Sequence, residues 1–167
     1  KQRRLAAIAA QHLLGGFPLE VFDGDATMYC NDWVGAVLKE LHATLQQRGS
    51  TQGTEPKIFV LSVMGLQSSG KSTMLNLMFG TRLPTSAGRC TRGVFMQMVP
   101  SNREEYDYVM LLDTEGLRSN QFHGLPRSEA RDNRLATFSL LPADACILMV
   151  SNEDDATLKE VLVRIRI

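Results

Sequence analysis

Apolar side chains recur at helical spacing in residues 1–53, which predicts a helical N-terminal lead-in made of two helices. The first helix ends at two glycines, and we expect it to pack against its own domain or against sequence outside this chain; contact of this basic helix with a membrane is the less favoured alternative. Its apolar positions are Leu5, Ile8, Leu13 and Leu14. We expect Asn31 or Asp32 to cap the second helix, which buries an apolar side chain at every fourth position. That stripe consists of Trp33, Val37, Leu41 and Leu45.

After residue 54 the pattern changes to short apolar runs that alternate with helical segments, so we expect a second unit, residues 54–167. The expected strands are 58–63, 94–99, 106–112 and 145–150, and the expected helices begin near residues 71 and 127. A polar turn joins strands 94–99 and 106–112, which can therefore pair as a hairpin. Alternating strands and helices predict an α/β fold with a mainly parallel sheet.

Charge and cysteine content narrow the possible partners and location. The chain of 167 residues has 18 basic and 18 acidic side chains, so it carries no net charge that would attract nucleic acid. Its apolar runs are far shorter than a membrane-spanning helix, and we expect no transmembrane segment. Three scattered cysteines do not form a disulfide framework, which favours a reducing compartment. Because the chain opens with Lys1, we expect it to be a piece of a longer reading frame.

Residues 65–72 read GLQSSGKS, a full match to the GxxxxGK[ST] phosphate loop, between a strand and a helix. Glycines let the backbone curve so that consecutive N–H groups surround a triphosphate. Lys71 can reach the β- and γ-phosphates, and the Ser72 hydroxyl can ligate Mg²⁺. The expected nucleotide contacts from this loop are Gly65, Gln67, Ser68, Ser69, Gly70, Lys71, Ser72 and Thr73. The motif predicts a P-loop NTPase three-layer fold.

Two downstream stretches fit the same site. Asp113 opens the sequence DTEG at the carboxyl end of a strand, where ligands of open α/β sheets bind. Asp113 can support the Mg²⁺ shell, and the Gly116 N–H can meet a γ-phosphate. Thr91 can place its hydroxyl on Mg²⁺ and its carbonyl on the attacking water, although an ordinary turn threonine is the alternative. The predicted metal ligands are Ser72, Thr91 and Asp113.

Residues 152–155 (NEDD) superficially match the [NT]KxD element that reads guanine in GTPases. We reject this assignment because the stretch comes one strand too early and Glu153 replaces the lysine. The first turn of a helix is the better interpretation. Residues 161–167 alternate as a strand would. Because the base-reading strand is missing, we expect the chain to be a C-terminally truncated, phosphate-binding part of the fold. The residues present do not separate guanine from adenine.

The motifs together resemble the GTPase domain of the interferon-inducible very large GTPases. The resemblance runs from residue 12 to about residue 159. It rests on HLLGGFPLEVFDGDA, KIFVLSVMGLQSSGKSTMLNLMFG, SAGRCTRGVFMQM, LLDTEGLRS and ADACILMVSNEDDATLKEV. It implies guanine nucleotide binding with Mg²⁺, a cytoplasmic or nuclear location, and a much larger parent protein.

More distant resemblances concern the phosphate loop. LLDTEG is similar to guanylate-binding proteins and atlastins, which carry an arginine in the loop where Ser68 stands here. The Gln67-Ser68 pair instead resembles dynamins, in which the glutamine helps to position water and the serine helps to hold a monovalent cation. This resemblance implies catalytic roles for Gln67 and Ser68, beside Thr91, and a cation that neutralises charge on the phosphates.

The sequence therefore predicts GTP binding and Mg²⁺-dependent GTP hydrolysis. A second hypothesis is an assembly module that binds GTP or GDP, oligomerises and turns over little. In a homodimer formed through the G-domain face, Arg89 and Arg92 would act as fingers in trans, or they are simply solvated. ATP chemistry stays open because the base-reading segment is absent.

Overall fold

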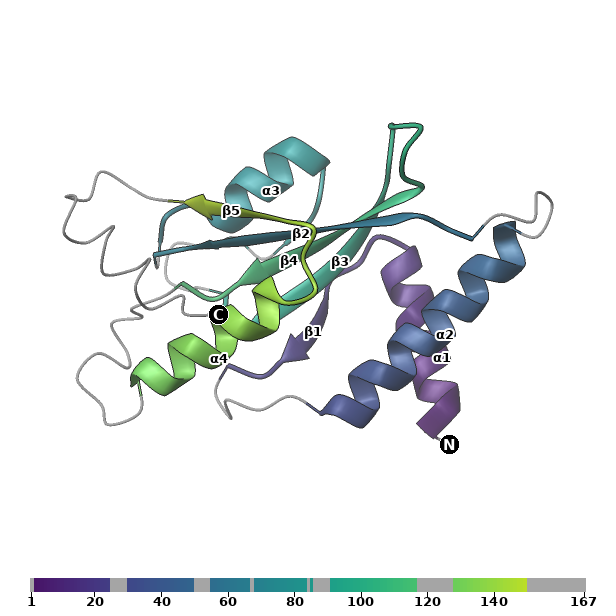
Figure 1. Cartoon of the computed structure of the whole chain (residues 1–167), viewed down its shortest axis with the longest axis horizontal. Coiled ribbons are helices and arrows are strands. Elements are labelled where there is room, and N and C mark those ends of the chain that lie inside the picture. Colours follow the sequence, from purple (N-terminus) through teal and green to yellow (C-terminus); the bar gives the residue numbers. More distant parts are fainter. Residues whose placement is uncertain are drawn as a thin grey trace.

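The computed structural model describes residues 2–24, 30–49, 55–66, 68–83, 85, 91–116 and 128–149. Its helices are α1 (Gln2–Leu14), α2 (Asn31–Gly49), α3 (Lys71–Phe79) and α4 (Ser128–Leu140). Its strands are β1 (Leu19–Phe22), β2 (Ile58–Gly65), β3 (Val94–Pro100), β4 (Tyr108–Thr114) and β5 (Ala145–Met149). Figure 1 shows these elements in chain order around one sheet.

The sheet has the strand order β1-β3-β4-β2-β5 in the described part of the chain. β2 runs parallel to both of its neighbours, β4 and β5, so it is an interior strand, although β4 and not β2 is the middle strand of the described order. β3 pairs antiparallel with β4, which confirms the expected hairpin, and β1 adds a second antiparallel pair. The sheet is therefore mixed, with a parallel part at β4-β2-β5, and the α/β class is confirmed.

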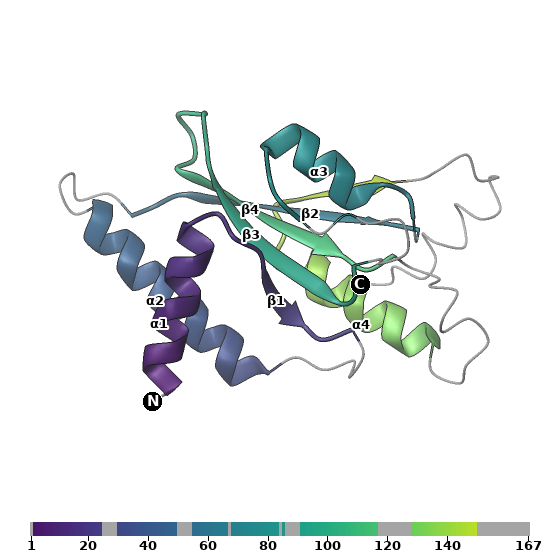
Figure 2. The ribbon, with the colours of Figure 1, turned by 180° about the vertical axis from the view of Figure 1, so that it is seen from behind.

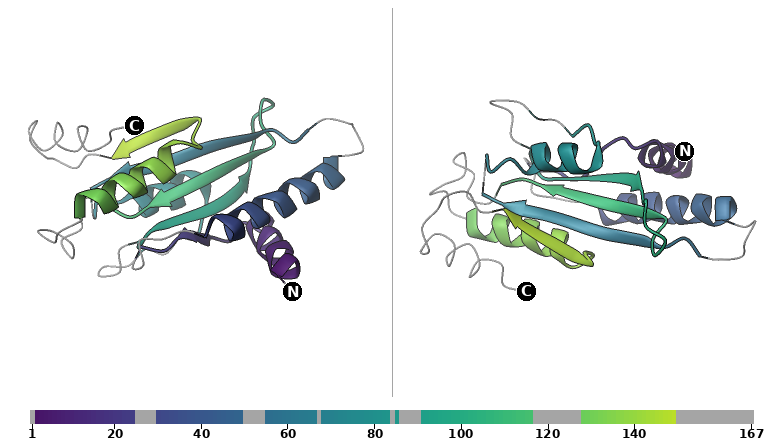
Figure 3. Two further views of the ribbon diagram at one scale, coloured as in Figure 1. Left: turned by 60° about the horizontal axis from the view of Figure 1, so that its bottom comes forward. Right: turned by 90° about the horizontal axis from the view of Figure 1, so that it is seen from above.

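Helices cover both faces of the sheet, as the view from above in Figure 3 shows. Successive side chains of a strand point to opposite faces. Leu111 of β4 packs against Leu75 of α3, whereas its neighbours Met110 and Leu112 join the core on the other face. Met64 of β2 packs with Ala136 of α4 on that other face. The layers are those of a three-layer fold.

Helix α1 buries only part of its predicted apolar stripe. Leu13 is buried, whereas Leu5 and Ile8 are 53% and 55% exposed, so these two do not pack within the described part of the domain. The other buried positions are Ala6, Ala9 and Ala10. Alanines at positions i, i+3 and i+4 form one face of a helix and let two backbones approach closely. Three alanines together with Leu13 therefore form the buried face of α1.

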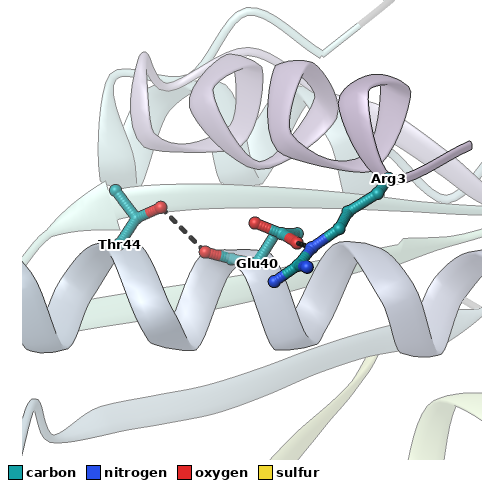
Figure 4. Close-up of polar contacts among 3 residues, drawn as sticks. All are labelled: Arg3, Glu40 and Thr44. Carbon is teal, nitrogen blue, oxygen red and sulfur yellow. Dashed lines mark hydrogen bonds and ion pairs between the residues drawn. The ribbon is translucent and has the colours of Figure 1, made fainter. Parts of the chain in front are cut away.

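The pair α1 and α2 lies beside β1 and β3, as the view from behind in Figure 2 shows. One exposed ion pair joins the two helices: Arg3 Nε donates to Glu40 Oε1 at 3.0 Å (Figure 4). Within α2, the Thr44 hydroxyl donates to the Glu40 carbonyl oxygen at 2.8 Å. An exposed pair of this kind contributes about 0–1 kcal/mol, so burial of apolar side chains holds the helices together.

The predicted stripe of α2 is confirmed: Val37, Leu41 and Leu45 are buried, and Trp33 packs partly buried against the same core. The cap differs by one residue, because the Val34 N–H bonds the Cys30 carbonyl oxygen and Asn31 already lies in the helix. Strand β1 was not predicted. It adds Val21 and Phe22 to the core that α1, α2 and β3 share. The division at residue 54 stays a prediction, although segments on both sides of it contribute to one core.

No described helix combines the length and the apolar character that crossing a membrane would require.

Candidate nucleotide-binding site

The loop between β2 and α3 winds tightly. Ser68 and Gly70 adopt left-handed conformations, with φ of 62° and 84°. This conformation costs a residue other than glycine about 1–3 kcal/mol and clusters at functional sites. At the end of β2, Gly65 has no space for a side chain because a β-carbon would meet the Met149 carbonyl. The backbone is therefore curved where the sequence places the phosphate loop.

The N-terminus of α3 is suited to an anion. Gly70 is the N-cap, no side chain caps the first turn, and that turn contains no acidic residue. First-turn amides have no partner within a helix, and the helix dipole favours negative charge at this end. Thr73 of the same turn is exposed. These features support the predicted phosphate contacts of residues 69–73.

Lys71 is buried, with 6% of its surface exposed. Its Nζ donates to the carbonyl oxygens of Leu66, at 2.8 Å, and Gly65, at 3.4 Å. The loop backbone thus holds the ammonium group at the point where β2 ends. The Ser69 hydroxyl is also buried, and it finds no hydrogen-bond partner within the described residues. A buried polar atom without a partner is costly unless a ligand satisfies it.

Three residues from three segments form one hydrogen-bonded cluster. The Ser72 hydroxyl donates to Asp113 Oδ2 at 2.7 Å, and the Thr91 hydroxyl donates to the same oxygen at 3.1 Å. The two hydroxyl oxygens lie 3.1 Å apart. The structure therefore brings together the three residues that the sequence analysis named as metal ligands, although it does not test that role.

The oxygen atoms of this cluster fit a hard cation. Asp113 is 1% exposed, and its Oδ1 is buried without a hydrogen-bond partner among the described atoms. Burial raises the pKa of Asp113 above its ordinary value, while hydrogen bonds from Ser72 and Thr91 and the nearby Lys71 charge act in the opposite direction. A cation beside the orphaned oxygen would offset the cost of the buried charge. Carboxylate and hydroxyl oxygens are the donors that Mg²⁺ prefers.

The DTEG turn continues from the end of β4 as predicted. Its four residues are buried, and the Thr114 hydroxyl donates to the Val63 carbonyl oxygen at 2.8 Å, which joins β4 to β2. Glu115 contacts the segment that carries Thr91: its Oε2 accepts from the Gly93 N–H at 2.8 Å. Sequence analysis did not find this contact, because no local pattern shows that Gly93 lies beside Glu115.

Some predictions fall on parts of the chain that the structure does not describe. They concern Gln67, Arg89, residues 152–155 and residues 161–167. Their roles stay predictions, as do the ligand roles of the residues placed above.

Comparison with known proteins gives the family. A family model described as URGCP-like GTPase domain matches residues 1–166. The chain belongs to this family. It is 37% identical over 163 residues to interferon-induced very large GTPase 1 of Homo sapiens, a match that covers 95% of this chain and 6% of that protein. It is 40% identical over 124 residues to up-regulator of cell proliferation of Bos taurus, covering 70% of this chain and 13% of that protein.

A more distant relative matches about half of this URGCP-like domain. The protein SEY1 homolog of Dictyostelium discoideum is 36% identical over 97 residues, or 53% of this chain and 10% of that protein. The chain thus spans a small fraction of each curated relative described here. Family membership confirms the resemblance found in the sequence.

Proposed function

We propose that this URGCP-like GTPase domain binds GTP with Mg²⁺ and that its hydrolysis of GTP depends on Mg²⁺. The observation that carries the proposal is the Ser72–Asp113–Thr91 cluster, in which the phosphate loop, the DTEG turn and an intervening segment meet. The cluster lies at the carboxyl ends of parallel strands β2 and β4, the ordinary ligand position of an α/β sheet.

Each residue of the site has a proposed part in binding. The main-chain N–H groups of residues 69–73 surround the phosphates, and Lys71 exchanges its carbonyl partners for phosphate oxygens. Ser72, Thr91 and Asp113 hold the metal shell, and the Gly116 N–H contacts the γ-phosphate. A bound Mg²⁺ would supply neutralising charge to the phosphate oxygens. These interactions hold the triphosphate in a fixed position, which is the main protein contribution to phosphoryl transfer.

Further parts of the proposal rest on the resemblance to dynamins and on the relatives. Gln67 positions the attacking water, and Ser68 helps to hold a monovalent cation beside the phosphates. Pairing of two G-domain faces and a location in the cytoplasm or nucleus stay predictions. The substrate and turnover of the whole protein belong to the proposal as well, because the chain covers little of its relatives.

Titration with fluorescent nucleotides tests the proposal. The full chain is titrated with labelled GTP, GDP and ATP in Mg²⁺. The Lys71→Ala variant should bind GTP about 100-fold more weakly, since a truncated charge partner costs about 2–5 kcal/mol. The control is Lys39→Ala, which removes an exposed lysine of α2 and should bind as the wild type does.

Two results would contradict the proposal. One is full GTP affinity in Lys71→Ala; the other is a wild-type chain that prefers ATP to GTP. A preference for ATP would be compatible with the phosphate site but would mean that the domain binds adenine nucleotides and not guanine nucleotides.

A further inference from the structure

Glu115 forms a two-point bridge to Gly93. Its Oε2 accepts from the Gly93 N–H at 2.8 Å, and its own N–H donates to the Gly93 carbonyl oxygen at 2.7 Å. Glu115 is only 3% exposed, so both bonds lie in a buried, low-dielectric environment. The bridge joins Gly93, two positions after Thr91, to Glu115, which directly precedes Gly116. It therefore connects the two segments predicted to contact the γ-phosphate and the metal.

Gly24 of the lead-in packs closely against both sides of this bridge. A β-carbon on Gly24, just after β1, would lie 2.7 Å from Glu115 Oε2 and 2.8 Å from the Arg92 carbonyl carbon, and would meet the Gly93 nitrogen. Gly93 has φ of 74°, and a β-carbon there would meet the Phe22 carbonyl oxygen. Both glycines are thus required by the close approach of three backbones.

We propose that Glu115 is a positioning residue, which holds the Thr91 segment against the DTEG turn, and that Gly24 of the lead-in closes the same contact. The proposal rests on the proposed function, because it concerns residues expected to contact GTP. Glu115 acts through Thr91 and Gly116, so its loss weakens contacts to the γ-phosphate more than contacts shared with GDP. The carboxylate already serves a backbone N–H, which favours this role over that of a general base for the attacking water.

Two substitutions of Glu115 distinguish the effect of side-chain length from the effect of charge. Glu115→Gln keeps an acceptor oxygen at the same reach and loses the charge, whereas Glu115→Asp keeps the charge and shortens the reach. If Glu115 is a positioning residue, Glu115→Asp should bind a non-hydrolysable GTP analogue about tenfold more weakly, with GDP affinity close to wild type. Glu115→Gln should keep most of the wild-type affinity for the analogue. If Glu115 is a general base, the parent protein should hydrolyse GTP faster with Glu115→Asp, which keeps the carboxylate, than with Glu115→Gln, which loses it.

Gly24→Ala tests the lead-in from outside the nucleotide motifs. The added methyl group should displace Gly93 and Glu115 and lower the preference for the GTP analogue over GDP by a similar factor. The matched control is Gly35→Ala in α2, where an added β-carbon meets no atom within 4 Å. If Glu115→Asp does not fold by circular dichroism, Gly24→Ala and Glu115→Gln still decide the question.

Hydrogen exchange in the nucleotide-free chain gives a readout independent of binding. The Gly93 amide should exchange faster in Glu115→Asp and Gly24→Ala and near the wild-type rate in Glu115→Gln. The positioning role would be overturned if Glu115→Asp kept the wild-type preference for the GTP analogue over GDP. It would also be overturned if Glu115→Asp and Glu115→Gln lost equal affinity for the analogue. A wild-type chain that binds neither nucleotide would refute the proposed function, while unchanged Gly93 exchange would refute the inference separately.

Discussion

Two regions of the molecule differ in what they bury. The layer made by α1 and α2 against β1 and β3 buries apolar side chains, among them Leu13, Phe22 and Leu45. The edge where β2 and β4 end buries Lys71, Asp113, Thr114 and Glu115. Atoms without a hydrogen-bond partner among the described residues also lie at this edge, on Ser69 and Asp113. The first region is held mainly by apolar contacts, whereas the second has buried polar groups that a ligand can satisfy.

The difference implies that stability and nucleotide binding can be changed separately. Apolar burial stabilises a fold by about 25 cal/mol per Å² and needs no ligand. Buried polar groups cost free energy unless they are paired, and such a cost is often found at functional sites. Glu115 and Gly24 are the exception, because they join the two regions. Substitutions away from the contact between Glu115 and Gly24 should therefore change either stability or nucleotide affinity, but not both.

The largest expected effect on stability is a truncation in the apolar layer. Leu45 is 2% exposed on α2, and Leu45→Ala should lower the free energy of unfolding by about 2–5 kcal/mol through lost burial and a cavity. Urea unfolding measures the loss. The GTP affinity of the chain that stays folded should not change, and an affinity loss beyond the unfolded fraction would break the separation of the two regions.

An intermediate effect is expected where α1 meets α2. Ala10 is fully buried, so Ala10→Leu should overpack the contact and cost about 1–3 kcal/mol. Ile8→Ala, on the exposed face of the same helix, should change stability by less than about 0.5 kcal/mol. Thermal unfolding of both variants checks the comparison. Equal destabilisation would mean that the larger side chains of α1, and not its alanines, hold the layer.

The same helix shows what could be read from the sequence. Spacing predicted that residues 2–14 form a helix, because periodicity depends on local geometry. It named Leu13, which is buried, together with Leu5 and Ile8, which are exposed, and it did not name the small alanines that complete the buried face. Strand β1 was missed for a related reason: its four residues are stabilised by pairing with β3, which lies far along the chain.

The candidate site was more predictable than the lead-in. The phosphate loop and the DTEG turn are fixed by residue type at set spacing, so their residues could be named without a structure. The convergence of Asp113 with the phosphate loop was expected because Asp113 lies at the carboxyl end of a strand, and Thr91 was named from its place in the segment between the two motifs. The Glu115–Gly93 bridge was not found, because the expected hairpin did not fix the register that places Gly93 opposite Glu115, next to the Val94–Thr114 pair. Chemistry carried by short motifs is therefore readable from the sequence, whereas strand register and the close approach of Gly24 are not.

The smallest effect on stability, and an opposite effect on binding, is expected at Asp113. Burial raises the pKa of this carboxyl group, so between the ordinary value of 3.8 and the raised value the folded chain binds more protons than the unfolded chain. Stability of the nucleotide-free chain should thus fall as pH rises through that window, and the loss persists at neutral pH. Asp113→Asn removes the ionised group, so it should flatten this part of the pH profile and slightly stabilise the nucleotide-free chain.

Binding should change in the other direction. Asp113→Asn is expected to weaken Mg²⁺-dependent GTP binding by about 10–100-fold, the usual cost of losing a group that supports a metal site. Urea unfolding across pH and nucleotide titration with and without Mg²⁺ measure the two effects on one variant. Asp32→Asn, at an exposed position of α2, is the matched control and should change neither. A variant that loses stability at neutral pH together with affinity would show that Asp113 is a structural residue, and the contrast between the two regions would fail at its central position.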